Sequence, residues 1–156
     1  FIQALEKSQL SVQVIALCGR DEAARQALEA MQESLQHVTL RALGYRDDMF
    51  QLMQISDAIV ARPGTGTTSE AIMAACPLLL NTLGGIMPQE WITVKYLRSQ
   101  GVPAKRLKKP ADLASQIQQL SSNPQQLAAL KQTMIALQPS VQPVEIIDYV
   151  VELTRR

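Results

Sequence analysis

A run of small and hydroxylated residues, Gly64-Thr65-Gly66-Thr67, stands between an apolar segment and a helical pattern. Small residues let a phosphate approach the backbone, and the amides that open a helix have no partners within it. The hydroxyls of Thr65 and Thr67 would add hydrogen-bond donors. We therefore expect this segment to hold a diphosphate; the alternative is a tight turn in which a threonine caps the following helix.

Two other phosphate motifs fit this segment poorly. A Walker loop ends in Gly-Lys-Ser/Thr, and no lysine stands here. The dinucleotide fingerprint needs a glycine where Ser69 stands and an acidic residue where Asn81 ends the next apolar run. The pattern therefore favours neither an NTPase nor a dinucleotide-binding protein.

Charged residues flank this segment on both sides. Glu70 is expected in the first turn of the helix that follows, where its carboxylate can accept two hydrogen bonds from a ribose diol or cap its own helix. Arg20 and Arg62 could stabilise negative charge on a departing diphosphate. Of the two, Arg20 is the better candidate to reach a ligand, whereas Arg62 could be structural.

The elements that must position these residues alternate between strands and helices. Apolar runs predict strands at 11–17, 38–43, 57–61, 77–81 and 102–105. Helical spacing predicts helices at 22–35, just after Asp47 and Asp48, at 70–75 and 88–99, and in three segments that finish the chain. This order predicts an α/β fold, a Rossmann-like open parallel sheet with helices on both faces. Ligands of such sheets bind beyond the carboxyl ends of the strands.

Length and composition place the chain among ordinary globular domains. Its 156 residues are 47% hydrophobic and 19% charged, which fits one domain. The net charge of +1 gives no reason to expect nucleic-acid binding. Cys18 and Cys76 lack metal-site spacing and are expected as buried free thiols of a reducing compartment. No apolar run approaches the ~20 residues that span a bilayer, so a cytoplasmic protein is expected.

Four segments, in this order, resemble the C-terminal half of the GT-B glycosyltransferases of family 28. That family contains the monogalactosyldiacylglycerol (MGDG) synthases, which are the most similar, and the transferase that adds GlcNAc to the peptidoglycan lipid precursor. The resemblance covers about Val12 to Leu137, and its segments are CGRDE, LGYRDDMFQLMQISDAIVARPG, GTGTTSEAIMAACPLLLN and MPQEWITVKY. The sequence departs from the family's pattern at Cys76, Pro88 and Thr93, which leaves the identity of the sugar open.

The resemblance implies a role for each residue of a UDP-sugar site. Tyr45 and Arg46 would flank the uracil, with Met49 packed nearby and Gly19 at the end of the first strand. The diphosphate would lie on the segment from Gly64 to Thr67, and Glu70 would bind the ribose. Gln89 and Glu90 would bind the hydroxyls of the transferred sugar. Neither a cofactor nor a metal is expected, since the sequence has no Asp-x-Asp motif or histidine cluster.

The implied function is the donor-binding half of an inverting transferase that moves galactose, glucose or GlcNAc from UDP to a lipid-like acceptor. The chain begins without Met in a helical pattern, so we expect 1–156 to be one nucleotide-sugar-binding domain of a longer protein. Its partner would be an N-terminal acceptor domain that carries the general base, and this part alone would be inactive. Basic residues at 105–109 could touch a membrane surface. The alternatives are a separate donor-binding subunit and half of a nucleotide-sugar epimerase.

Overall fold

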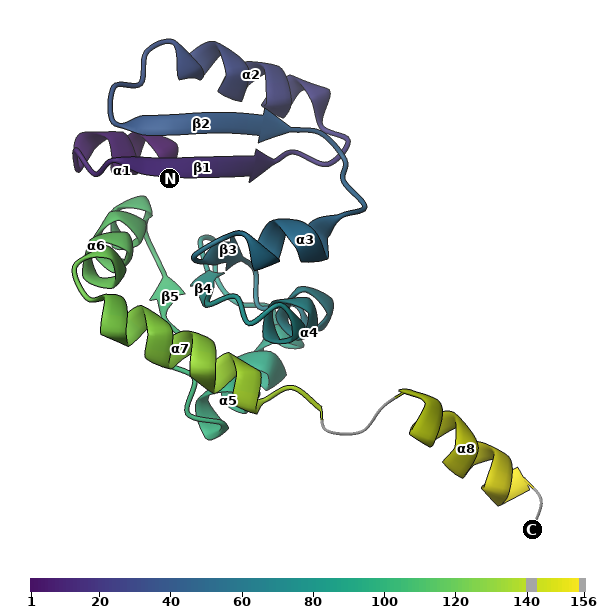
Figure 1. Ribbon diagram of the computed structural model, residues 1–156. Coiled ribbons are helices and arrows are strands. Elements are labelled where there is room, and N and C mark those ends of the chain that lie inside the picture. Colours follow the sequence, from purple (N-terminus) through teal and green to yellow (C-terminus); the bar gives the residue numbers. More distant parts are fainter. Residues whose placement is uncertain (140–142, 155–156) are drawn as a thin grey trace.

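The computed structural model describes residues 1–139 and 143–154, and within them strands and helices alternate over most of the chain (Figure 1). The elements are α1 (Ile2–Lys7), β1 (Val12–Leu17), α2 (Glu22–Gln32), β2 (Val38–Leu43), α3 (Met49–Gln54), β3 (Ile59–Ala61), α4 (Thr65–Met73), β4 (Leu78–Asn81), α5 (Glu90–Ser99), β5 (Arg106–Leu107), α6 (Pro110–Ser121), α7 (Pro124–Ala136) and α8 (Pro143–Thr154).

All strand pairs among the described residues are parallel, which confirms the α/β class. The strands nevertheless form two sheets, β1–β2 and β3–β4–β5, where one open sheet was expected. β1 and β2 pair over six residues, from Val12 beside Val38 to Leu17 beside Leu43. β3 and β5 have only three and two residues, so the second sheet has short ladders and gains much of its order from packing.

Two clusters of buried side chains form the core. One cluster joins the two sheets, because it contains Leu40 of β2, Leu79 of β4 and Leu107 of β5. The other lies beneath α4, α5 and α7 and is centred on Leu80 of β4, whose side chain is 0% exposed. β4 therefore contributes apolar residues to both clusters, which is why its three leucines are all buried.

β1 differs from the expectation that both faces of every strand are covered. Its residues alternate between half-buried and exposed, and the outward-facing Ile15 and Leu17 are exposed by about 40% each. Val12, Val14 and Ala16 of β1 face the shared cluster with α1 and α6, so the opposite face of β1 is the less covered one. Near-continuous burial of both faces, as expected for these strands, is thus not found at β1.

The predicted strand at 102–105 is also wrong, since β5 begins at Arg106. Val102 and Ala104 are buried as an apolar run requires, but Ala104 donates its amide to the Val102 carbonyl in a tight turn. Pro103 stands between them and has no amide to give to a ladder, which favours a turn at this point. α2 likewise ends at Gln32, earlier than predicted.

Side-chain caps hold the amino ends of several elements. Asp21 accepts a hydrogen bond from the Ala24 amide at 2.9 Å, which confirms it as the cap of α2. Glu6 of α1 accepts hydrogen bonds from the amides of Gln36, His37 and Val38, and these bonds lower the pKa of its carboxyl. α1 is thereby tied to the start of β2.

α8 stands apart from the rest of the molecule in Figure 1. Its described apolar side chains, Val144, Ile147, Val150, Val151 and Leu153 among them, are exposed. Within residues 1–139 and 143–154, no helix has the length and apolar character that crossing a bilayer requires.

Candidate functional site

The Gly/Thr segment is the start of a helix and not a loop. Gly64 has extended backbone angles, φ −74° and ψ 145°, and α4 begins at the next residue. No side chain caps this end of α4, so the alternative of a threonine N-cap is wrong. The amides of Thr65 to Thr67 lie in the first helical turn, where no carbonyl of the helix can accept from them. They form the positive end of the α4 dipole, which suits an anion.

Glu70 is the sixth residue of α4, so its predicted place in the first turn is wrong. α4 begins at Thr65, whereas the predicted helix began at Glu70. Glu70 is exposed and follows Gly66 and Thr67 by four and three residues, which places all three on one face of α4. A ligand lying along this face would meet the helix amides first and this carboxylate one turn later.

The carboxyl ends of β1 and β2 lie side by side, since the Cys18 amide donates to the Leu43 carbonyl at 2.8 Å. Gly19 follows with φ +57°, a left-handed conformation that glycine adopts without strain. The Arg20 guanidinium then lies 5.6 Å from the centre of the Tyr45 ring, and Tyr45 is 68% exposed. Two of the residues predicted to bind the donor are therefore already in contact.

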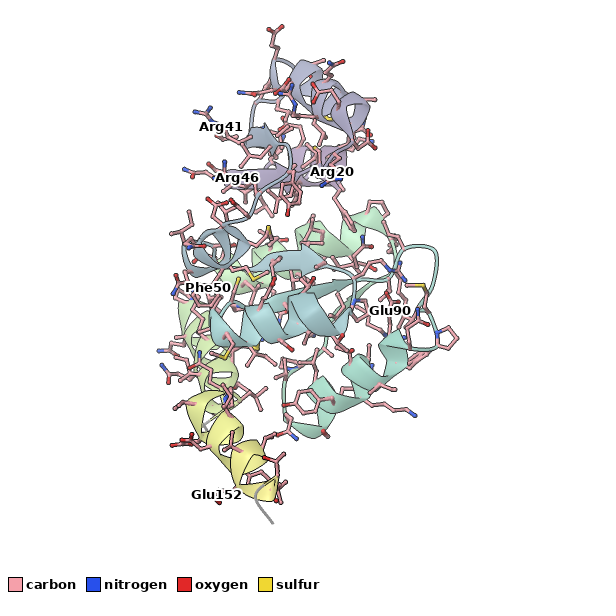
Figure 2. The ribbon with its side chains drawn as sticks, turned by 90° about the vertical axis from the view of Figure 1, so that its right-hand side faces the viewer. Arg20, Arg41, Arg46, Phe50, Glu90 and Glu152 are labelled. Carbon is pink, nitrogen blue, oxygen red and sulfur yellow. The ribbon has the colours of Figure 1, made fainter. Side chains whose placement is uncertain are left out.

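Arg46 and Met49 complete the predicted base site but differ in exposure. Arg46 is exposed and pairs with Asp48, whose carboxylate raises the pKa of the guanidinium. Met49 is half-buried and packs against the core cluster beneath α4. Figure 2 shows Arg20 and Arg46 in the upper part of the view, around the ends of β1 and β2, with Glu90 lower and at the right.

Glu90 and Gln89, both predicted to bind a sugar, have opposite environments. Gln89 is exposed, and its side-chain amide donates to the Met87 sulfur at 3.4 Å. Glu90 is only 4% exposed and forms two hydrogen bonds with Arg62, Nε to Oε1 at 2.8 Å and Nη2 to Oε2 at 2.6 Å. The Arg62 guanidinium and the Met87 amide together lower the pKa of Glu90. A sugar-binding role for Glu90 stays a prediction, and this geometry favours a supporting role.

Sequence reasoning missed the partners of two residues at this edge. Arg62 and Glu90 are 28 positions apart, and no local pattern links them. Likewise, Arg106 at the start of β5 lies 5.5 Å from the centre of the Trp91 ring, so that ring already has a cation on it. The only signals that could have suggested the first pair were an arginine directly after β3 and an acid at the start of the helix that follows β4.

Elsewhere in the described ranges, the structure has one small cavity and one open hollow of about 330 Å³ between α1 and the end of α2. A cavity of about 30 Å³ lies at the amino ends of β4 and β5, between Leu78, Val102 and Met134 among others. Ligand pockets measure roughly 300–1,000 Å³, so this cavity is too small for a nucleotide. In residues 1–139 and 143–154, no three His, Cys, Asp or Glu side chains gather where they could hold a metal ion. Cys18 and Cys76 are free, and burial raises the pKa of Cys76 to about 11.

Residues 2–142 match the model of a known family, the glycosyltransferase family 28 C-terminal domain. The chain belongs to glycosyltransferase family 28. This assignment confirms the resemblance drawn from the four segments, each of which ends at or follows the carboxyl edge of a strand in the structure. The match ends at residue 142, so α8 lies beyond the matched residues.

Curated relatives of this family 28 chain are named for monogalactosyldiacylglycerol or diacylglycerol. The chain is 30% identical over 105 residues to probable monogalactosyldiacylglycerol synthase 2 of Oryza sativa subsp. indica, covering 67% of this chain and 21% of that protein. It is 33% identical over 69 residues to the processive diacylglycerol beta-glucosyltransferase of Bacillus subtilis, covering 44% and 18%. The chain thus spans about a fifth of the length of these relatives.

A solved structure confirms the fold. The crystal structure of Acinetobacter baumannii MurG superimposes with a TM-score of 0.67 at 21% identity, over 97% of this chain and 44% of that one. At this identity the likeness concerns the architecture alone. Parallel strands flanked by helices are therefore common to the two structures.

Proposed function

We propose that this chain is the donor-binding domain of an inverting hexosyltransferase that takes a UDP-linked hexose. One observation carries the proposal. The residues expected to bind the donor follow the carboxyl ends of β1, β2, β3 and β4, where ligands of parallel sheets bind, and the chain belongs to family 28. Both kinds of relative are named for diacylglycerol products or acceptors, which supports a lipid-like acceptor. Galactose, glucose and GlcNAc all remain candidates for the hexose.

The diphosphate would bind at the start of α4. At this point the amides of Thr65 to Thr67 can donate hydrogen bonds to a diphosphate. The positive end of the helix dipole would stabilise its negative charge. Arg20, exposed beside Tyr45, has no carboxylate partner among the described residues and is free to stabilise the departing UDP. Arg62 is unsuited to that role because Glu90 already neutralises it.

The remaining parts of the donor would lie on either side of the diphosphate. Glu70, on the same face of α4, would accept hydrogen bonds from the ribose hydroxyls. Tyr45 and Arg46, with Gly19 and Met49 behind them, would flank the uracil at the ends of β1 and β2. On the other side, the exposed amide of Gln89 would bind the hexose.

In the whole protein, an N-terminal acceptor domain would carry the acceptor site and the general base, so we expect this chain to bind donor without transferring it. A separate donor-binding subunit would behave in the same way in isolation. Family membership favours transfer over epimerisation. We further propose that the reaction needs no metal or other cofactor and takes place in the cytoplasm. The exposed Lys105, Lys108 and Lys109 support contact with an anionic membrane surface.

Calorimetric titration of the 156-residue chain tests this proposal, using UDP, UDP-galactose, UDP-glucose, UDP-GlcNAc and NAD. We expect the UDP compounds to bind and NAD not to bind. Glu70→Ala should weaken UDP binding about tenfold or more, since hydrogen bonds to a charged group are lost. Glu33→Ala, on the surface just after α2, is the matched control and should bind like the wild type. A folded chain that ignores every UDP compound would refute the proposal.

A further inference from the structure

The ion pair between Arg62 and Glu90 contains a buried carboxylate. Charged side chains are rarely buried unless they are paired, and Glu90 is 4% exposed. Its two oxygens accept three hydrogen bonds, two from Arg62 and one, at 2.9 Å, from the amide of Met87. Three of the roughly four acceptor sites of this carboxylate are therefore used within the protein, and its low exposure leaves little of it open to a ligand.

Arg62 also holds the segment before α5. Beyond Glu90, its Nη2 donates to the Gly85 carbonyl at 3.0 Å and its Nη1 to the Leu83 carbonyl at 3.4 Å. Gly84 and Gly85 have φ values of +75° and +96°, which glycine alone tolerates readily. The Arg62 guanidinium therefore binds two carbonyls and one carboxylate of the segment 83–90. Without these bonds, the segment would be a glycine-rich connection with few restraints.

The same arginine belongs to the backbone that forms the start of α4. Its carbonyl accepts from the Gly64 amide at 2.8 Å, and Pro63 between them is fully buried. The position of Arg62 therefore couples two segments that lie far apart in the sequence: 64–67, where the diphosphate is proposed to bind, and 83–89, which ends in Gln89. The bidentate geometry is specific to a planar guanidinium, and a lysine could not reproduce it.

We propose that Arg62 and Glu90 are positioning residues that hold the segment 83–89 beside the start of α4, so that this segment binds the hexose of the donor. The proposal rests on the donor-binding function proposed above. It assigns the contacts with the sugar to Gln89 and the backbone of 83–87, and it removes Glu90 from the set of direct ligands.

Two measurements on the 156-residue chain test this inference, hydrogen exchange of the amides at 83–89 and calorimetric affinities for UDP and UDP-hexose. In Arg62→Lys and Glu90→Gln we expect exchange at 83–89 to rise by about tenfold or more, because the bonds that restrain the segment are weakened. UDP affinity should change by less than about threefold, whereas any additional affinity that the hexose gives over UDP should be lost. The matched control is the exposed pair on α2, tested as Arg25→Lys and Glu22→Gln, which should alter neither readout.

Each of the other possible results contradicts a specific part of this proposal. Unchanged exchange at 83–89 would show that the pair does not restrain the segment. An equal loss of UDP and UDP-hexose affinity, with a lower melting temperature, would show a purely structural role. If the wild-type chain bound no UDP, the proposed function would fail together with the role in sugar binding, whereas the exchange data would still decide whether the pair holds the segment. Direct ligation by Glu90 would instead appear as lost hexose affinity with unchanged exchange.

Discussion

The carboxyl ends of the two sheets differ in how their side chains are held. At the ends of β1 and β2, Arg20 lies over an exposed Tyr45 and Arg46 pairs with Asp48 at the surface. At the ends of β3 and β4, a buried carboxylate fixes an arginine and a backbone segment in one arrangement. Groups that are already ordered lose less entropy on binding. Before a ligand binds, the end proposed for phosphate and sugar is thus held by buried contacts, whereas the end proposed for the base is held by contacts at the surface.

The largest expected difference between the two sheets is in stability. Leu80→Ala removes a side chain that is 0% exposed from the core beneath α4 and should lower the free energy of unfolding by about 2–5 kcal/mol. Leu17→Ala at the end of β1 removes one that is 40% exposed and should cost less than about 1 kcal/mol. Urea denaturation of both variants measures the difference. Similar costs at the two positions would mean that the exposed face of β1 is covered in solution.

A smaller effect is expected at Thr93, in the first turn of α5. Its hydroxyl is buried without a hydrogen-bond partner among the described residues. Thr93→Val removes the polar atom at nearly constant shape and should raise the free energy of unfolding by about 1 kcal/mol. Thr39→Val, at an exposed position on β2, is the matched control and should stay within about 0.5 kcal/mol. Destabilisation by Thr93→Val would show that the hydroxyl does have a partner in solution.

Acid should release the segment held by Glu90. The pKa of Glu90 in the folded protein lies below the ordinary value of 4.5. The ion pair therefore restrains the segment fully above that value, and the restraint is lost as pH falls through the lower folded pKa. Exchange at 83–89, corrected for intrinsic rates, should therefore still be slow at pH 5 and become faster toward about pH 3. In Glu90→Gln the same amides should exchange quickly at both pH values. A wild-type segment that stays protected at low pH would contradict this.

The smallest expected effect is at the base end. Tyr45→Ala removes the ring beneath Arg20, and an exposed cation–π contact is worth about 0.5–1 kcal/mol, or roughly a two- to fivefold loss of UDP affinity. Tyr45→Phe keeps the ring and should bind like the wild type. Calorimetry on both variants separates the contribution of the ring from that of the hydroxyl. A loss beyond about a hundredfold for Tyr45→Ala would show that the base end is as strictly organised as the phosphate end.

The sequence pattern alone was sufficient to predict much of the fold and that the candidate site residues follow the ends of strands. Apolar runs and helical spacing located β1, β2, β4 and most of the helices, because burial leaves a periodic trace. The start of α4 was missed because glycine and threonine are weak helix formers, so the helical pattern becomes visible only after them. The two-residue β5 and the division into two sheets depend on tertiary packing. The Arg62–Glu90 pair joins distant segments and leaves no periodic trace.

Amide chemical-shift mapping of the 156-residue chain with UDP and then UDP-hexose tests the donor-binding proposal most directly. We predict that UDP shifts the amides of Thr65, Gly66 and Thr67 together with those around Gly19 and Tyr45. The hexose should add shifts within 83–89 and leave the amino ends of β4 and β5 unaffected. Shifts confined to the amino ends of the strands, or none at saturating UDP, would contradict donor binding at the carboxyl edge.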